Sequence, residues 1–366
     1  MLHGIRVVEF EGLGPGPFAA MLLADLGAEV ITIHRAVPAD TPGRTEQNLL
    51  DRGKRSIVLD LKSEADLKIV KALLKTADGL IEGMRPGVME RLGLGPEVVH
   101  ELNPKLIYGR MTGWGQEGPL AKDAGHDLNY IGRAGALWYA SNPSEPPFTP
   151  PTLVGDIGGG AMYLAVGMLS GFLSVKNGAK GCVVDAAIVD GAAHMMSLLM
   201  SLRSAGGLNK ERGKSTLDGP HWSRCYATKD GGFMSVQCLE PKFYATFLDC
   251  LGLREDPDFL RQFDASLWPS LTERLKAIFC TETMAHWDAL FTGKDACVAP
   301  VLSPEDSGQD PHIAARGIWF ESEGQLQART APRFSTWQPY RDVAIPQKDA
   351  DRVSLLTELN WIKTDE

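Results

Sequence analysis

The chain has 366 residues, of which 44% are apolar and 23% charged, and its formal net charge at pH 7 is −9. This composition is that of an ordinary globular protein, and the length predicts one large domain and one smaller domain. The acidic balance argues against a surface that binds nucleic acid or an anionic membrane.

Predicted strands and helices alternate through the first half of the chain. Apolar runs predict strands at residues 5–10, 29–33, 56–61, 79–82 and 105–111. Apolar positions at helical spacing predict helices at residues 18–26, 64–74 and 96–102. This alternation predicts an α/β fold with a Rossmann-like, mostly parallel sheet.

The second half changes character after a long apolar segment at residues 161–175. We expect this segment to be a buried core helix that is too short to span a membrane. Two predicted strands, at residues 225–228 and 233–237, flank a turn and indicate a hairpin. Further helices are predicted at residues 243–251, 271–278 and 284–291.

These elements predict how the chain is divided. Residues 1–190 would form the large domain, 191–224 a linker helix and loop, and 225–302 a smaller α+β domain. Residues 303–366, rich in proline and irregular, would return as a linker and end in a helix near residues 354–361 that docks on the large domain.

Targeting and cysteine patterns favour the cytoplasm. The N-terminal sequence lacks a basic stretch followed by an apolar one, and Lys363-Thr364-Asp365-Glu366 is not a peroxisomal signal. The six cysteines form no C-x-x-C pair and show no metal-ligand spacing. We therefore expect reduced, mostly buried thiols in a cytoplasmic protein with no metal site.

A loop of glycines and prolines, Gly12-Leu13-Gly14-Pro15-Gly16-Pro17, lies between the first predicted strand and helix, where a dinucleotide-binding fingerprint would sit. Two prolines interrupt it and no G-x-G-x-x-G is formed. The second strand is followed by His34-Arg35, where an NAD-binding protein needs an acid for the ribose. The loop therefore predicts a tight turn rather than an NAD site.

Basic residues cluster near the ends of the second and third strands. Arg35 follows one strand, and a cation there favours a phosphorylated ribose. Arg52, Lys54 and Arg55 precede the next strand, and a phosphorylated adenosine such as that of coenzyme A would suit them. The alternative is a solvated basic patch, and the sequence does not decide between the two.

A histidine and a carboxylate stand in two separate glycine-containing motifs. His126 lies in Gly125-His126-Asp127-Leu128-Asn129-Tyr130, and Asp156 lies in Gly155-Asp156-Ile157-Gly158-Gly159-Gly160. Such a pair suits an enzyme that removes a proton from one face of a carbon and returns one to the other. Asp127 and Glu240 are candidates to orient the imidazole of His126.

The position of Asp156 allows two interpretations. It is expected at or near the N-cap of the following helix, where a carboxylate accepts backbone N–H bonds. Capping alone does not need three following glycines. The second interpretation is that the glycines let a ligand approach the backbone, so that the helix start stabilises negative charge on a substrate oxygen.

The chain resembles the class III CoA-transferase superfamily nearly end to end. The resemblance rests on Gly4-Ile5-Arg6-Val7-Val8-Glu9, Leu23-Ala24-Asp25-Leu26-Gly27-Ala28-Glu29-Val30, Glu82-Gly83-Met84-Arg85-Pro86-Gly87, Met111-Thr112-Gly113-Trp114-Gly115 and Asp295-Ala296-Cys297-Val298-Ala299-Pro300. Within this superfamily, the Gly-His-Asp-x-Asn-Tyr signature and the Leu239-Glu240-Pro241 element resemble the alpha-methylacyl-CoA racemase branch.

The resemblance implies a set of site residues. His126 and Asp156 match the two acid/base residues, and Glu240 matches the residue that partners the histidine. The positions that match coenzyme A contacts are Arg35, Leu59, Asp60, Leu61, Lys62, Arg85, Arg91, Gly125, His126, Asp127, Leu128, Asn129 and Tyr130. Coenzyme A would be part of the substrate, with no prosthetic group. The resemblance also implies an interlocked homodimer, in which Glu240 comes from the partner chain.

The activity that the resemblance implies is an isomerase of fatty acid metabolism, which moves a proton at C2 of a 2-methylacyl-CoA thioester through an enolate. The main rival is CoA transfer, in which Asp156 attacks the thioester as a nucleophile and His126 is not needed. A third hypothesis is a catalytically silent CoA-binding protein. One departure from the racemase pattern is Arg224, which stands where an acid is expected and leaves the acyl group open.

Overall fold

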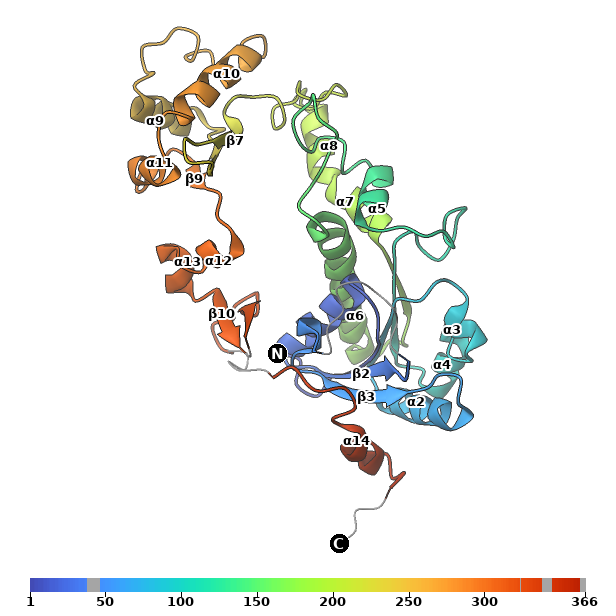
Figure 1. Cartoon of the computed structure of the whole chain (residues 1–366). Helices are drawn as coiled ribbons and strands as arrows, with labels where there is room; N and C mark the ends of the chain where they lie inside the picture. Colours follow the sequence, from blue (N-terminus) through green and yellow to red (C-terminus); the bar gives the residue numbers. More distant parts are fainter. Residues whose placement is uncertain (38–46, 323, 338–343, 363–366) are drawn as a thin grey trace. The chain divides into compact units, whose positions relative to one another are not determined.

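The computed structural model describes residues 1–37, 47–322, 324–337 and 344–362 (Figure 1). The chain divides into two compact units. The first comprises Met1–Ala136, Pro150–Met196 and Arg329–Glu366, and the second comprises Leu137–Thr149 and Ser197–Ala328. The division into domains at residues 190, 224 and 302 stays a prediction.

A six-stranded sheet, parallel throughout, forms the centre of the first unit. Its strands are β1 (Arg6–Phe10), β2 (Glu29–Arg35), β3 (Arg55–Leu59), β4 (Gly79–Glu82), β5 (Ile107–Thr112) and β6 (Val183–Ala187). The order β3-β2-β1-β4-β5-β6 is that of doubly wound nucleotide-binding sheets, and it reverses between β1 and β4. The predicted parallel sheet is confirmed. The sequence prediction missed β6, because β6 is only half buried and shows no continuous apolar run.

Helices cover both faces of this sheet. They are α1 (Pro15–Asp25), α2 (Glu64–Thr76), α3 (Val88–Arg91), α4 (Pro96–Leu102), α5 (Asp127–Ala134), α6 (Met162–Lys176), α7 (Ile188–Met195) and α14 (Arg352–Glu358), with a short 3-10 helix η1 (Leu49–Asp51). Consecutive residues of β1 serve opposite cores: Val8 packs with Leu73 of α2, and Val7 packs with Leu23 of α1. Burial on both faces explains why the strands are continuous apolar runs.

The helix that carries Asp156 begins earlier than the sequence predicts. A π-helix, η2 (Leu153–Ala161), follows Thr152 and runs directly into α6, so Asp156 lies inside a helix and not at its N-cap. Together they make a 24-residue segment with an 18-residue window of mean hydropathy 1.4, which by length and composition alone could cross a membrane. The prediction that this segment is too short is therefore wrong. Core helices of globular proteins meet the same criterion, and α6 packs on β5 and β6.

The second unit is built on a small antiparallel sheet of β7 (Ser223–Ala227), β8 (Phe233–Gln237) and β9 (Val298–Pro300). Its helices are α8 (Ser197–Ser204), α9 (Pro241–Leu251), α10 (Trp268–Phe279), α11 (Met284–Phe291), α12 (Pro304–Ser307) and α13 (Pro311–Arg316). Aromatic side chains dominate its core, with Trp222, Phe247 and Phe279 fully buried. The predicted hairpin and three helices are confirmed.

Two sequence predictions for this part of the chain are wrong. Residues 303–346 were expected to be irregular, but they include α12, α13 and a hairpin of β10 (Trp319–Ser322) with β11 (Gln325–Ala328). Strands of four residues are too short to produce a recognisable alternation. The cysteines were expected to be mostly buried, but Cys182, Cys225, Cys280 and Cys297 are exposed.

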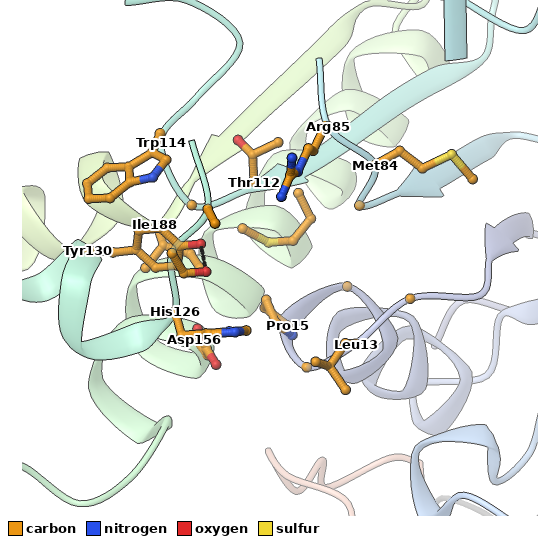
Figure 2. A pocket seen from close by; sticks show the side chains of 18 of the residues that line it. Leu13, Pro15, Met84, Arg85, Thr112, Trp114, His126, Tyr130, Asp156 and Ile188 are labelled. Carbon is orange, nitrogen blue, oxygen red and sulfur yellow. Dashed lines mark hydrogen bonds between the residues drawn. The ribbon is translucent and has the colours of Figure 1, made fainter. Parts of the chain in front are cut away.

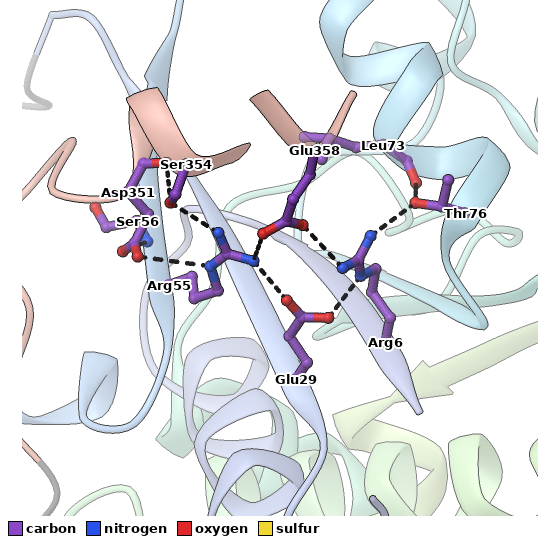
Figure 3. A network of polar contacts seen from close by, with 9 residues as sticks. All are labelled: Arg6, Glu29, Arg55, Ser56, Leu73, Thr76, Asp351, Ser354 and Glu358. Carbon is purple, nitrogen blue, oxygen red and sulfur yellow. Dashed lines mark hydrogen bonds and ion pairs between the residues drawn. The ribbon is translucent and has the colours of Figure 1, made fainter. Parts of the chain in front are cut away.

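The C-terminal segment of the first unit lies along β3. The Ser56 N–H donates to Asp351 Oδ2 at 2.9 Å, and the Val58 N–H donates to Asp349 Oδ1 at 2.7 Å. Arg55 of β3 pairs with Glu29 of β2 and with Glu358 of α14 (Figure 3). Carboxylates from the end of the chain therefore satisfy both the backbone and the side chains of this outer strand.

Candidate active site

A pocket of about 310 Å³ opens at the carboxyl end of the sheet, beside the reversal between β1 and β4. Residues 12–17 after β1, 83–86 after β4 and 112–114 after β5 line it, together with His126, Tyr130 and Asp156 (Figure 2). Crevices at this point of doubly wound sheets are where such folds bind ligands, because the strand ends and their loops diverge there. The pocket therefore collects both predicted acid/base residues.

His126 is exposed and immediately precedes α5. Its backbone N–H donates to Asn129 Oδ1 at 3.0 Å, which fixes the turn into the helix. Tyr130 holds the preceding residue, because its hydroxyl donates to the carbonyl of Gly125. The Tyr130 ring also packs edge-on against Trp114, with centroids 4.7 Å apart. Asn129 and Tyr130, predicted as coenzyme A contacts, thus also hold the loop that carries His126.

Glycine is required at two places around this ring. A Cβ on Gly113 would lie 2.0 Å from Tyr130 Cζ, and a Cβ on Gly125 would lie 2.7 Å from Tyr130 Cε1. Neither distance is compatible with a side chain at those positions. The two glycines leave room for the Tyr130 ring to pack between the end of β5 and the start of α5.

Asp156 is partly buried and lies beside His126 in the pocket (Figure 2), and its Oδ2 lies 3.6 Å from the position of a Cβ on Gly14. Burial raises the pKa of Asp156 to about 6, with a further contribution from the negative charge of Asp127, while His126 acts in the opposite direction. A carboxyl group with that pKa is present in both protonation states near neutral pH, which suits proton transfer.

The carboxylate of Asp127 bonds to the backbone of η2 at Asp156 rather than to the imidazole of His126. Its Oδ1 accepts the N–H groups of Gly155 and Asp156, each at 2.9 Å, and its side chain is buried. Its Oδ2 has no hydrogen-bond partner among the described residues, so it does not bond to the ring of His126. The prediction that Asp127 orients the imidazole is therefore wrong.

The glycines after Asp156 serve helix packing. A Cβ on Gly159 would lie 2.8 Å from the Ala192 backbone nitrogen, and a Cβ on Gly191 would lie 1.9 Å from the Gly159 carbonyl oxygen. A Cβ on Gly160 would lie 2.9 Å from Ile188 Cγ1. The close neighbour that the glycines admit is α7 and not a ligand, which corrects the second interpretation of this motif.

The basic residues before β3 are used inside the protein. Lys54 Nζ lies 2.6 Å from Glu9 Oε2, and both side chains are fully buried. Arg52 is also buried, paired with Asp25. Arg55 pairs with Glu29 and Glu358, as described above. For Arg52, Lys54 and Arg55, both predictions, a phosphate site and a solvated patch, are wrong, whereas Arg35 is exposed.

The other predicted coenzyme A contacts lie in three places: the pocket, the ends of β2 and β3, and the end of α3. Arg85 is exposed and lines the pocket. Arg35 is exposed at the end of β2, directly opposite Leu59 in the sheet, and Asp60, Leu61 and Lys62 follow on the same edge. Arg91 ends α3 and is exposed, but it does not line this pocket.

Glu240 and Arg224 belong to the second unit. Glu240 immediately precedes α9. Arg224 clamps a turn of its own unit, because its guanidinium donates to the carbonyls of Asp218, Gly219 and Pro220 at 3.0 to 3.1 Å. An arginine that closes a backbone turn cannot be exchanged for an acid without loss of these bonds.

Sequence reasoning missed several residues of the pocket wall. Leu13, Met84, Thr112 and Trp114 line the pocket but were given no role at the site. Each lies in or next to a loop that leaves the carboxyl end of a central strand. Since parallel strands end at one edge of the sheet, the predicted strand ends were a signal that could have identified them.

Comparison with known proteins identifies the family. The model of CoA-transferase family III matches residues 2–352. The chain is 39% identical over 354 residues to alpha-methylacyl-CoA racemase of Mus musculus, covering 96% of this chain and 90% of that protein. It is 40% identical over 335 residues to alpha-methylacyl-CoA racemase of Homo sapiens, covering 90% and 86%.

A solved structure supports the same assignment. The crystal structure of a CaiB/BaiF family protein from Brucella suis matches this fold with a TM-score of 0.83 at 25% identity, covering 98% of this chain and 99% of that one. With the family model matched over nearly the whole length, the chain belongs to CoA-transferase family III.

Proposed function

We propose that this protein is a racemase that interconverts the (R)- and (S)-enantiomers of 2-methylacyl-CoA thioesters. The observation that carries the proposal is a pair of groups suited to proton transfer in one pocket: His126, and Asp156 with its pKa raised to about 6. The similarity to two alpha-methylacyl-CoA racemases over most of the chain supports the same reaction.

The proposed reaction is a 1,1-proton transfer. A thioester carbonyl can accept the electron pair released at C2 as an enolate, whereas a free carboxylate already carries a negative charge. Asp156, when ionised, takes the proton from C2 of the (R)-substrate, and protonated His126 gives a proton to the opposite face. The reverse direction starts from neutral His126 and protonated Asp156.

The enolate oxygen needs donors. The first N–H groups of α5, beginning with Asp127, have no acceptor within the helix, and the positive end of the helix dipole lies there. The N–H groups of Gly155 and Asp156 are already bonded to the Asp127 carboxylate. We therefore assign the oxyanion to the start of α5 rather than to the start of η2.

Coenzyme A binding is proposed along the same edge of the sheet. Arg85 lines the pocket, and Arg35 lies beside Leu59 and the segment Asp60-Leu61-Lys62 at the ends of β2 and β3. Arg91 and the segment from Gly125 to Tyr130 complete the proposed contacts. Exposed guanidinium groups suit the phosphates of coenzyme A, which enters as part of the substrate. The proposed chemistry uses no prosthetic group.

The proposal includes an interlocked homodimer in which Glu240 of one chain partners His126 of the other. Large apolar side chains on η2 and α6 support a partner surface, since Leu153, Val166 and Leu173 are each at least 58% exposed. Measurement of the molar mass by light scattering tests the dimer. We also place the protein in the cytoplasm and in fatty acid metabolism.

The deciding experiment follows the α-hydrogen by NMR in heavy water. Purified protein is mixed with (S)- or (R)-2-methylacyl-CoA without any acceptor acid. Deuterium entering at C2 from both enantiomers, with loss of chirality, is the expected result. Absence of exchange with several acyl groups would exclude the racemase.

CoA transfer is the alternative, because the family takes its name from that reaction. In it, Asp156 attacks the thioester carbonyl to give a mixed anhydride, and CoA then passes to an acceptor acid through an aspartyl thioester. Asp156→Ala abolishes both activities, whereas His126→Ala abolishes only racemisation. A protein without any turnover would point instead to a silent CoA-binding role.

A further inference from the structure

The carboxylate of Asp127 joins the two elements that carry the proposed acid/base pair. It belongs to the first residue of α5, next to His126, and it bonds to the backbone of η2 at Asp156. We propose that Asp127 is a positioning residue for Asp156, which fixes the backbone beneath that carboxylate and acts on it through a like charge. The catalytic consequence of this inference rests on the proposed function, whereas the contact itself does not.

Asp127, which belongs to α5, caps the start of a different helix, η2, by accepting hydrogen bonds from its first N–H groups. In a π-helix the N–H groups of the first turn have no acceptor within the helix. Ile157 finds one in the carbonyl of Thr152, and Asp127 Oδ1 serves Gly155 and Asp156 at 2.9 Å each. Hydrogen bonds to a carboxylate are stronger than those to a neutral acceptor. The start of η2 is therefore held in place by α5.

There is no space for a side chain between η2 and α5 at this contact. A Cβ on Gly155 would lie 2.5 Å from Asp127 Oδ1 and 2.8 Å from Ile131 Cγ2. Any side chain at position 155 would push η2 away from α5, and Asp156 would move with it. The glycine before Asp156 is thus explained by the approach of Asp127.

The charge of Asp127 acts on Asp156 at short range. Asp127 is only 5% exposed, and its second oxygen has no partner within the described part of the chain. Its negative charge contributes to the raised pKa of Asp156, and the Asp156 charge in turn contributes to the raised pKa of Tyr130.

Other charged groups on the elements around η2 act elsewhere. Asp190 of α7 acts on Asp185 of β6, and the ring of His194, also on α7, bonds to the Tyr163 hydroxyl. His126 is the group that opposes Asp127, because it lowers the pKa of Asp156. Asp127 and His126, neighbours in sequence, therefore tune Asp156 in opposite directions.

Two substitutions separate position from charge. Asp127→Asn keeps an oxygen that can accept both N–H groups but removes the charge, while Asp127→Ala removes both. The direct readout is NMR titration of the carboxyl carbon of Asp156 in protein with ¹³C-labelled aspartate, assigned by its absence from Asp156→Asn. We expect Asp127→Asn to lower the midpoint by about one pH unit.

The amide protons of Gly155 and Asp156 report whether the start of η2 is still held by the side chain at position 127. The Gly155 and Asp156 amide protons should stay protected from exchange with solvent in Asp127→Asn and lose protection in Asp127→Ala. Asp190→Asn is the matched control, since it removes an exposed carboxylate from α7, and it should change neither readout. An unchanged Asp156 midpoint in Asp127→Asn, or retained amide protection in Asp127→Ala, would overturn the inference. Should Asp127→Ala fail to fold, the titration of Asp127→Asn decides alone.

Enzyme kinetics provide a second test of the role of Asp127. For the (R)-substrate, Asp156 must be ionised, so Asp127→Asn moves the acidic limb of the kcat/KM profile to lower pH. For the (S)-substrate, Asp156 must be protonated, so the alkaline limb moves to lower pH as well. Asp127→Ala should lower kcat about 100-fold with little change in KM. If the wild-type protein shows no α-hydrogen exchange, the proposed function fails, while the titration and amide results still decide the role of Asp127.

Discussion

Two sets of carboxylates in the first unit differ in whether a cation lies beside them. In one set, Glu9 pairs with Lys54 and Asp25 pairs with Arg52. In the other set, Asp127 lies near Asp156, and neither forms an ion pair with a lysine or arginine of the described residues. Glu9 and Asp25 each have a buried cation within ion-pair distance, whereas burial and the charge of Asp127 raise the pKa of Asp156 to about 6. Carboxyl groups of this unit therefore differ in whether a cation lies beside them, and the one proposed for proton transfer pairs with no lysine or arginine in the described part of the chain.

The largest expected effect is on turnover. Asp156→Ala should reduce the interconversion of the enantiomers by at least about 10³-fold, because the proton acceptor for one face of C2 is lost. His126→Ala should have a similar effect, measured by NMR in heavy water with both enantiomers. The melting temperatures of both variants should stay close to or above that of the wild type. Interconversion of the enantiomers that survives in either variant would remove that residue from the mechanism, whereas exchange with retained chirality can still occur through the remaining base.

The next effect is on stability and tests the paired set. Lys54→Met retains most of the side-chain volume but leaves Glu9 buried without its cation, which should cost about 3–5 kcal/mol in the free energy of unfolding. Urea denaturation measures this loss. The control is Lys348→Met, because Lys348 is 31% exposed and its ion pair with Glu11 should contribute less than about 1 kcal/mol. Equal losses in both variants would break the comparison.

The smallest effect is a gain in stability at the reactive site. Because the pKa of Asp156 in the folded protein, about 6, is above the ordinary value of 3.8, its ionisation favours the unfolded chain. Stability from this group is complete below pH 3.8 and is lost as the pH rises through 6. Asp156→Asn should therefore be more stable than the wild type by on the order of 1 to 3 kcal/mol at pH 8, and the difference should vanish near pH 4. Thermal melts at the two pH values test the sign.

Local patterns in the sequence were enough to predict the parallel sheet and to single out two residues, His126 and Asp156, that line one pocket. Apolar runs and helical spacing identified five strands of the sheet, and the separate motifs around His126 and Asp156 identified the residues that meet in the pocket. The pairing of Lys54 could not be predicted in this way, because its partner Glu9 lies 45 residues away in sequence. Arg52 is likewise 27 residues from Asp25.

The π-helix and the direction of Asp127 also escaped prediction. An apolar pattern does not reveal whether a backbone N–H bonds four or five residues back, so η2 was not predicted and Asp156 was placed at a helix start. Asp127 contacts residues 28 and 29 positions away, and its orientation depends on the packing of η2. Motif reasoning therefore identified which residues are special without showing toward which neighbour each one turns.

The segment along β3 has a consequence for solubility. β3 ends the sheet, and the N–H groups of Ser56 and Val58 on its outer side are occupied by Asp351 and Asp349. A bare outer strand offers its backbone to the strand of any other molecule, which begins aggregation. Carboxylates that occupy these groups also repel a second chain that carries the same charges. Asp349 and Asp351 thus keep the sheet from pairing with a strand of another molecule.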